Sequence, residues 1–217
     1  MVEAWRERYP GYDVLRKWNT PSWNERTREV VAKRLAIARE PRLLSHKEFA
    51  TLTAIADRIT PQPNGREPIP IAALIEEKLL QGRHDGYRYE GMPREREAWE
   101  RGLRAIDAEA MTEHGKPFTA LNHLQQDALL KRVESGDAHD PAWGRMPPKS
   151  FFKLRVLSDI VRAYYLWPSA WNEIGWGGPA SPRGYVRTDY DERDPWEAME
   201  VRDGDVETAR ARNRRVG

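Results

Sequence analysis

Apolar residues recur every three to four positions through the middle of the chain, which is the spacing of an amphipathic helix. In the segment 46–59, for example, Phe49, Leu52 and Ile59 fall on one helical face. The same pattern predicts about six helices, over residues 22–38, 46–59, 71–80, 94–114, 122–133 and 149–167. No segment alternates between apolar and polar residues as a half-buried strand does. We therefore predict an all-α fold, a single helical bundle of about six helices with irregular, aromatic-rich arms at both ends.

Three of these helices begin with recognisable capping residues. Ser22 and Ser45 are each followed three residues later by a glutamate, which is the spacing of a capping box. Asn122 is followed in the same way by Gln125. The helix over 149–167 is apolar around most of its circumference, so we expect it to lie at the centre of the bundle.

Helical periodicity is absent from both ends of the chain, where proline, glycine and charged residues are frequent. We expect an N-terminal arm at 1–21, a helical domain at 22–167, an aromatic docking segment rich in glycine and proline at 168–200, and a charged tail at 201–217. The tail is either a frayed helix or a disordered segment.

Both arms are rich in aromatic residues, and the whole chain has 9 Trp and 8 Tyr. Aromatic side chains in irregular segments are typical of surfaces that dock on another protein. Such side chains also cover a chain's own core. Both interpretations stay open here, and one does not exclude the other.

The composition argues against several classes of function but does not identify one. The 217 residues include 36 basic and 34 acidic side chains, so the net charge of +2 gives no general attraction to nucleic acid or to anionic membranes. The arginines near the C-terminus are interleaved with acidic residues, unlike a track that follows phosphates. The chain has no cysteine, which excludes disulfides, thiolate metal sites and c-type haem attachment. We expect a soluble chain, because no stretch reaches the ~20 apolar residues of a membrane span and no export leader is recognisable.

Three patterns resemble functional motifs, and each has a simpler explanation. Asp137, His139 and Asp140 carry atoms that bind cations, yet an Asp-rich stretch between glycine and proline is more simply a turn. The segment Gly175–Ala180 matches a relaxed dinucleotide fingerprint, but a helix is predicted before it and Pro179 prevents immediate entry into a helix after it. Carboxylate pairs are expected on any charged helix surface. We therefore predict no catalytic, cofactor-binding or metal site.

Several segments together resemble the gluconate 2-dehydrogenase subunit 3 family. The most specific of them is FFKLRVLSDIVRAYYLWPSAWNEIGWGGPASPRGYVR at 151–187. Further similarity lies in GYDVLRKWNTPSWNERTREVVAKRL at 11–35, LSHKEFATLTAIADRITPQP at 44–63, FTALNHLQQDALLKRV at 118–133 and DPWEA at 194–198.

The resemblance implies a non-catalytic small subunit. Members of the family partner a FAD-dependent large subunit of the glucose–methanol–choline oxidoreductase type, which oxidises sugars, sugar acids, polyols or glycosides and often passes electrons to a cytochrome c subunit. FAD is then expected in the partner, with no cofactor in this chain. The small subunit is implicated in assembly, stability and export of the complex. Since no twin-arginine leader is recognisable here, the sequence by itself indicates the cytoplasm, and a periplasmic location would require export together with the partner.

The resemblance and the aromatic arms together predict where the partner binds. The residues expected at or beneath that surface are Trp167, Trp171, Asn172, Trp176, Tyr185 and Trp196. For Trp167 and Trp171, packing against the 149–167 helix is the alternative. Two other functions stay open, namely a stand-alone helical adaptor protein and a hydrolase that uses a pair of carboxylates.

Overall fold

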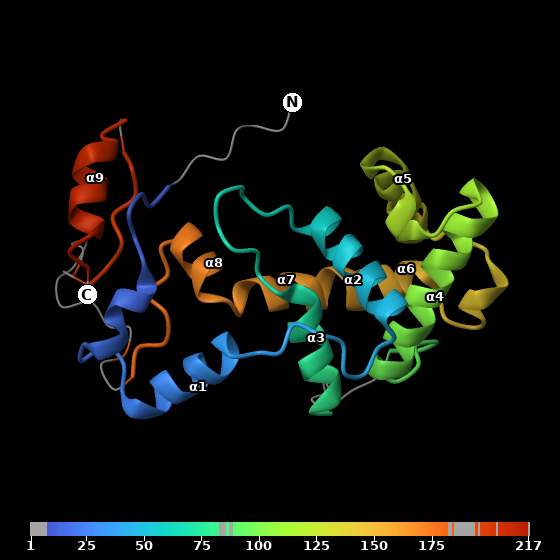
Figure 1. Ribbon diagram of the computed structural model, residues 1–217, viewed down its shortest axis with the longest axis horizontal. Helices are drawn as coiled ribbons and strands as arrows, with labels where there is room; N and C mark the ends of the chain where they lie inside the picture. Colours follow the sequence, from blue (N-terminus) through green and yellow to red (C-terminus); the bar gives the residue numbers. More distant parts are fainter. Residues whose placement is uncertain are drawn as a thin grey trace. The chain divides into compact units, whose positions relative to one another are not determined.

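The computed structural model describes residues 8–82, 86, 89–181, 184, 194, 196–202 and 204–216. These residues form nine α-helices and no β-strand, so the predicted all-α fold is confirmed (Figure 1). The helices are α1 (Glu25–Leu35), α2 (His46–Ile59), α3 (Ile71–Leu80), α4 (Glu95–His114), α5 (His123–Ser135), α6 (Pro148–Phe151), α7 (Ser158–Tyr165), α8 (Pro168–Glu173) and α9 (Val206–Asn213). Three short 3-10 turns are η1 (Val14–Asn19), η2 (Phe118–Ala120) and η3 (Pro141–Trp143), and η4 (Phe152–Leu157) is a π-helical segment. No helix in the described part of the chain combines the length and the apolar character that a bilayer span requires.

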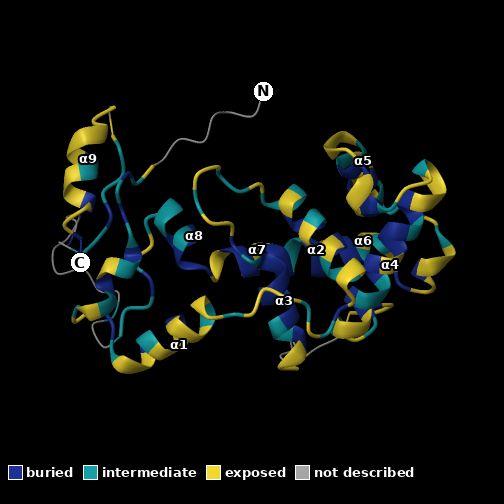
Figure 2. Cartoon of the chain, in the orientation of Figure 1, coloured by how far each residue is buried: buried dark blue, intermediate teal, exposed yellow. Residues whose placement is uncertain are grey.

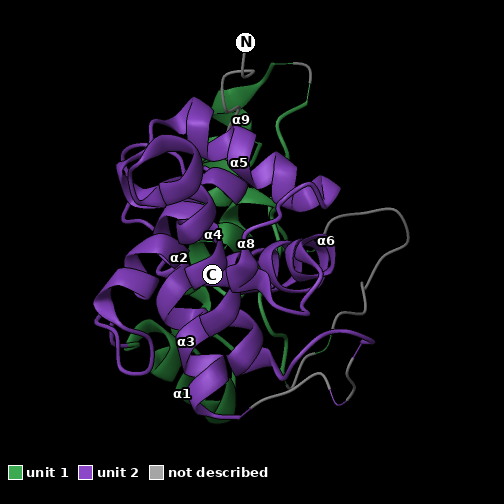
Figure 3. Ribbon diagram, turned by 90° about the vertical axis from the view of Figure 1, so that its right-hand side faces the viewer, with its two compact units in different colours: residues 1–37, 165–217 green, residues 38–164 purple. Residues whose placement is uncertain are grey.

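The chain divides into two compact units (Figure 3). Unit 1 combines residues 1–37 with residues 165–217, and unit 2 consists of residues 38–164. The first and the last helices therefore belong to the same unit although they are far apart in the sequence. The segment boundaries that we predicted after residues 21, 167 and 200 stay predictions.

Unit 2 is built around α2, which contacts α3, α4 and α5. The buried residues of α2 are Thr51, Leu52, Ile55 and Ala56. Leu52 belongs to the predicted apolar face, whereas Phe49 and Ile59 of that face are half-buried. Figure 2 shows buried and exposed residues on this helix. The helix begins as expected, because the Ser45 side chain accepts a hydrogen bond from Glu48 N while the Glu48 side chain accepts one from Ser45 N. Asn122 and Gln125 form the same reciprocal cap on α5.

One helical run extends from Pro148 to Tyr165, and its middle part, η4, is π-helical. Its buried face includes the charged residues Arg155 and Asp159 among apolar side chains. Val161 and Tyr165 are 40% and 44% exposed. The run therefore keeps a solvent-facing side, which the apolar pattern did not predict.

In unit 1, α1 begins three residues later than predicted. Its N-cap is Asn24, whose side chain accepts a hydrogen bond from Thr27 N at 2.9 Å, so the predicted capping box at Ser22 is wrong. The Asn24 N–H donates to the carbonyl oxygen of Ser181 at 2.8 Å, and this bond holds the chain extended up to the cap. The buried residues of α1 are Thr27 and Val31.

The two ends of the chain share one core in unit 1. Its buried residues are Tyr12, Val14, Trp23, Val31, Trp171, Ala198 and Val216. Asn213 in α9 is fully buried and donates to the carbonyl oxygens of Pro10 and Met199 at 3.1 and 2.9 Å. It also accepts a hydrogen bond from Met199 N at 2.6 Å. The charged tail therefore contains a helix that is tied to the N-terminal segment.

Candidate functional site

Three residues predicted to bind the partner, Trp171, Asn172 and Trp176, lie on α8 or just after it, in unit 1. Pro168 occupies the first turn of α8, where its missing N–H is not needed. The chain then turns at Gly175 and Gly178, whose φ angles are 66° and 70°. A side chain at Gly175 would also overlap the ring of Tyr9, so glycine fits both the angle and the space. This backbone brings Trp171 and the residues after it beside the N-terminal segment.

Trp171 is buried and engaged by the chain itself. Its indole N–H donates to the carbonyl oxygen of Tyr165 at 2.7 Å. Its ring lies 5.7 Å from the guanidinium of Arg34 and meets the Trp176 ring edge-to-face at 4.8 Å. Trp171 is thus part of the core of unit 1. Its role toward a partner stays a prediction.

Trp176 is held firmly and is also open to solvent. Its N–H donates to the carbonyl oxygen of Trp171 at 2.9 Å, and its own carbonyl accepts from the Tyr12 hydroxyl at 3.4 Å. The side chain is nevertheless 37% exposed, and Ile174 beside it in the sequence is 46% exposed. A rigid, partly exposed aromatic residue loses little conformational freedom when a partner covers it, which is typical of an interface anchor.

Asn172 and Trp167 have structural contacts. The Asn172 side chain accepts a hydrogen bond from Val14 N at 2.8 Å, which links α8 to the start of η1. Trp167 is buried, with 8% of its surface exposed. Tyr185 lies outside the described residues. For all three, partner binding stays a prediction.

Trp196 is half-buried and contacts Lys17, a buried residue that the sequence analysis did not predict. Its carbonyl oxygen accepts a hydrogen bond from Lys17 Nζ at 2.6 Å. Lys17 is only 1% exposed, and its ammonium lies 5.9 Å from the centre of the Tyr12 ring. A Cβ at Gly177 would lie 2.9 Å from that nitrogen, so the glycine leaves room for it. We missed Lys17 because a lysine in a charged segment is ordinarily on the surface.

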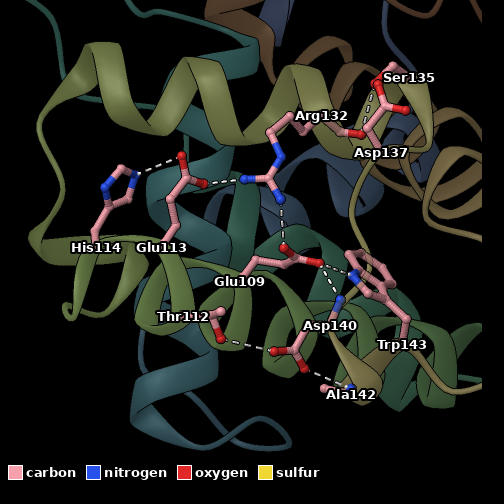
Figure 4. Close-up of polar contacts among 10 residues, drawn as sticks. All are labelled: Glu109, Thr112, Glu113, His114, Arg132, Ser135, Asp137, Asp140, Ala142 and Trp143. Carbon is pink, nitrogen blue, oxygen red and sulfur yellow. Dashed lines mark hydrogen bonds and ion pairs between the residues drawn. The ribbon is translucent and has the colours of Figure 1, made fainter.

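The turn around Asp137 and Asp140, in unit 2, is organised by protein donors (Figure 4). Asp137 accepts a hydrogen bond from Ser135 Oγ at 2.6 Å. Asp140 accepts from Ala142 N at 2.8 Å and from Thr112 Oγ1 at 3.2 Å. Across the described residues, no group of three or more metal-ligating side chains is present. The simpler interpretation, a turn, accounts for these contacts.

Glu109 lies next to this turn and contacts Arg132, Asp140 and Trp143 (Figure 4). Its Oε1 accepts from Asp140 N at 2.7 Å and from Trp143 Nε1 at 3.1 Å, and its Oε2 accepts from Arg132 Nη2 at 2.9 Å. Arg132 also pairs with Glu113. Glu109 therefore ties α4 to α5 and to the 140–143 segment, which is a structural role.

A second group of charged residues joins α3, α4 and the helical run, and we call it the ion network: the buried Arg155 and Asp159 and the half-buried Lys78 and Glu95. Lys78 Nζ lies 3.0 Å from both carboxylates, and Arg155 Nη1 lies 2.7 Å from Glu95 and 3.4 Å from Asp159. The indole N–H of Trp99 adds a hydrogen bond to Asp159 at 3.0 Å. Among the described residues, two cations thus face two carboxylates, so the charges of the buried Arg155 and Asp159 are paired. No sequence pattern indicated this network, since the same residue types cover every helix surface.

The Gly175–Ala180 segment does not have the geometry of a dinucleotide site. It follows α8 rather than a strand, and no helix begins within it or at Ser181. A dinucleotide fingerprint needs both elements, because the helix N-terminus holds the pyrophosphate.

Comparison with known proteins identifies a family. A family model described as gluconate 2-dehydrogenase subunit 3 matches residues 46–178. The matched region runs from α2 through α8 to Gly178, so it includes Trp167, Trp171, Asn172 and Trp176. It does not include 11–35 or 194–198, which carried part of the resemblance seen in the sequence. No curated protein and no solved structure gives a significant match.

Proposed function

The chain belongs to the gluconate 2-dehydrogenase subunit 3 family, and from this membership we propose that it binds and stabilises a FAD-dependent large subunit of a sugar or alcohol dehydrogenase. The family name supports a role as a subunit of an oxidoreductase complex, and we propose that this subunit is non-catalytic. We further propose that the large subunit is of the glucose–methanol–choline type and carries the FAD. Help in exporting the complex and contact with a cytochrome c subunit belong to the same proposal.

The observation that carries the proposal is the extent of the family match. It covers all of the helices from α2 to α8 and ends two residues after Trp176. Among the described members of the predicted docking set, that tryptophan combines a fixed position with an exposed ring. We therefore assign Trp176 to direct contact with the large subunit, supported from beneath by Trp171, and Trp196 to the edge of the same surface.

Co-purification with the natural partner tests the proposal. The tagged chain, expressed in its own cells, should recover a flavoprotein in stoichiometric amount, recognised by absorbance bands near ~370 and ~450 nm. Trp176→Ala should weaken this complex by about 2 kcal/mol or more, which is roughly a thirtyfold loss of affinity. A colourless chain recovered alone from cells that contain the flavoprotein would overturn the proposal and favour the stand-alone adaptor.

A matched control separates loss of contact from loss of fold. Leu124 is 82% exposed and belongs to unit 2, so Leu124→Ala removes a comparable exposed apolar side chain elsewhere. It should leave recovery of the flavoprotein unchanged. Circular dichroism of the isolated Trp176→Ala chain should show unaltered helix content, and a loss of helicity would assign Trp176 to the core of unit 1 instead.

A further inference from the structure

A small groove in unit 2 lies between α2, the proline-rich 61–70 segment and the start of α3. Its volume is about 230 Å³. Its apolar lining consists mainly of Phe49, Ala56, Pro68, Ile69, Ile71 and Ala72. The wall opposite α2 is fixed, because the Gln62 side chain accepts a hydrogen bond from Ile69 N at 2.6 Å and donates one to Ile69 O at 3.2 Å. The groove is therefore built into the fold and does not depend on a loose loop.

One carboxylate lies on the wall of this groove. Asp57 occupies the same face of α2 as Phe49 and Thr53, which line the groove with it. Among the described residues, no hydrogen bond or ion pair reaches the Asp57 carboxylate. Although the residue is exposed, surrounding protein atoms remove enough water from it to raise its pKa, against the smaller opposing effects of Arg58 and His123.

The cations around Asp57 are engaged with other acids. The guanidinium of Arg58 donates to both carboxylate oxygens of Asp127, at 2.7 and 2.8 Å. Arg39, on the rim of the groove, pairs with Glu67 at 2.6 Å. The groove thus combines apolar walls with a partly desolvated carboxylate that no cation in the described part of the chain contacts by a hydrogen bond or an ion pair.

We propose that this groove binds a basic side chain, lysine or arginine, presented by a partner protein. The apolar walls would cover the methylene stem, and Asp57 would pair with the charged end, as long basic side chains bury their stems and keep the charge at a polar rim. The size of the groove supports one side chain as the occupant, since pockets for cofactors and drug-sized ligands measure about 300–1,000 Å³. That the partner is the dehydrogenase large subunit rests on the proposed function, but binding of the side chain itself does not.

An anion is the competing occupant. Pro70 gives α3 no side-chain cap, and Ala72 and Ala73 of its first turn line the groove with Arg39. A helix N-terminus favours negative charge. Asp57 opposes this occupant by direct repulsion, so the sign of the preferred ligand distinguishes the two possibilities.

Titration of the isotope-labelled full chain with three capped amino acids tests the sign. N-acetyl-lysine methylamide should shift the amide resonances of 49–57 and 62–73 in a saturable manner. The uncharged norleucine analogue should bind about two- to fivefold more weakly, as expected for one ion pair at a partly exposed site. The glutamate analogue should bind most weakly. Equal binding of the lysine and norleucine probes, tighter binding of the glutamate probe, or no binding of any probe would overturn the proposal.

Two variants assign the effect to Asp57. Asp57→Asn should abolish the preference for lysine over norleucine, whereas Arg39→Gln should keep or increase it because it removes a nearby positive charge. A preference that survives Asp57→Asn would overturn the proposal. Co-purification separates this outcome from the proposed function: failure of the unaltered chain to recover a flavoprotein refutes the dehydrogenase partner, while the probe titration still decides what the groove binds.

Discussion

Gly102 lies in the middle of α4, where an alanine would ordinarily stabilise the helix by about 1 kcal/mol. Here an added Cβ would overlap the ring of Phe151, with two ring atoms at 2.5 Å. That ring cannot move freely, because the rings of Trp99 and Trp143 pack against it, with centroid distances of 5.4 and 5.8 Å. Overpacking of a core costs about 1–3 kcal/mol and outweighs the gain in helix propensity. We expect Gly102→Ala to lower the free energy of unfolding by about 1–2 kcal/mol, measured by urea denaturation.

The double variant Gly102→Ala with Phe151→Leu is the control for that prediction. A smaller side chain at 151 should relieve the overlap, so Phe151→Leu should cost less when it is combined with Gly102→Ala than on its own. Additive losses, or a stabilising effect of Gly102→Ala alone, would show that the helices move apart to accept the methyl group.

Asp127 and Arg58 form an ion pair whose effect on stability depends on pH. The hydrogen bonds from Arg58 lower the pKa of Asp127 below its ordinary value of 3.8. A carboxyl group with a lowered folded-state pKa stabilises the fold above the unfolded-state pKa, and this stabilisation is lost as pH falls through the folded-state value. Because the Asp127 side chain is 41% exposed, the pair contributes less than about 1 kcal/mol. Asp127→Asn should therefore reduce stability at about pH 7 and leave it unchanged at about pH 2 in urea denaturation.

Asp57, on the same helix as Arg58, should affect the pH dependence of stability in the opposite direction. Partial desolvation by surrounding protein atoms raises its pKa, so the folded protein holds the proton more tightly than the unfolded chain does. The resulting stabilisation is present below the unfolded-state pKa and is lost as pH rises through the higher folded-state value. We expect Asp57→Asn to raise the free energy of unfolding slightly at about pH 7 and to have no effect at about pH 2. The same urea series measures it, and a destabilised Asp57→Asn chain at neutral pH would mean that the carboxylate has a stabilising partner.

At the scale of the helices, sequence patterns correctly predicted the helix caps that depend on neighbouring residues alone. The caps at Ser45 and Asn122 formed as expected, because both partners of each cap lie within four residues. Ser22 has the same spacing to a glutamate, yet α1 starts from Asn24. The difference comes from Ser181, 157 residues away, which bonds the Asn24 side chain and backbone. No pattern near residue 22 contains that information.

In the candidate site, too, the sequence predicted the segment but not the features that depend on distant contacts. The sequence pointed to the aromatic segment after the 149–167 helix, but it could not tell the exposed Trp176 from the buried Trp171. Which ring faces outward depends on contacts with Tyr12 and with Arg34 of α1, both distant in the sequence. The buried Lys17 was missed for a related reason, since burial of a charge is decided by tertiary partners.

The ion network joins three helical elements, so its contribution to stability can be tested at the scale of the helices. Asp159 accepts bonds from Lys78, Trp99 and Arg155 at once and is only 2% exposed. Removing one member of a buried ion pair leaves the others without compensation and costs about 3–5 kcal/mol. We expect Asp159→Asn to lower the free energy of unfolding by about 3 kcal/mol in urea denaturation. Asp137→Asn, the same change at an exposed position, should cost under about 0.5 kcal/mol, and equal effects of the two would contradict a stabilising network.

For the whole molecule, the sequence predicted the class of fold and most helices, but not which segments associate. The pairing of residues 1–37 with 165–217 depends on bonds such as Asn213 to Pro10 and Asn172 to Val14. Their partners are separated by most of the chain, and helical periodicity describes each helix alone. The family match crosses both units, because it begins at residue 46 in unit 2 and ends at residue 178 in unit 1.

The discontinuity of unit 1 should lower its stability relative to unit 2. Its two segments are separated in sequence by the whole of unit 2, so forming unit 1 requires closure of a long loop, whereas unit 2 is one continuous segment. Unit 2 contains only two of the 9 tryptophans, Trp99 and Trp143, so fluorescence reports mainly on unit 1. We expect the fluorescence transition in urea to precede the loss of helical circular dichroism, because the less stable unit opens first.

The isolated segment 38–164 provides the control for this order. It should fold without the rest of the chain, and its circular dichroism transition should coincide with the later of the two transitions of the full protein. Because the proposed docking residue Trp176 belongs to unit 1, a bound large subunit should then raise the earlier transition more than the later one, as any ligand stabilises the state to which it binds. Coincident transitions in the free protein would show instead that the two units unfold as one cooperative structure, and the partner would then stabilise both together.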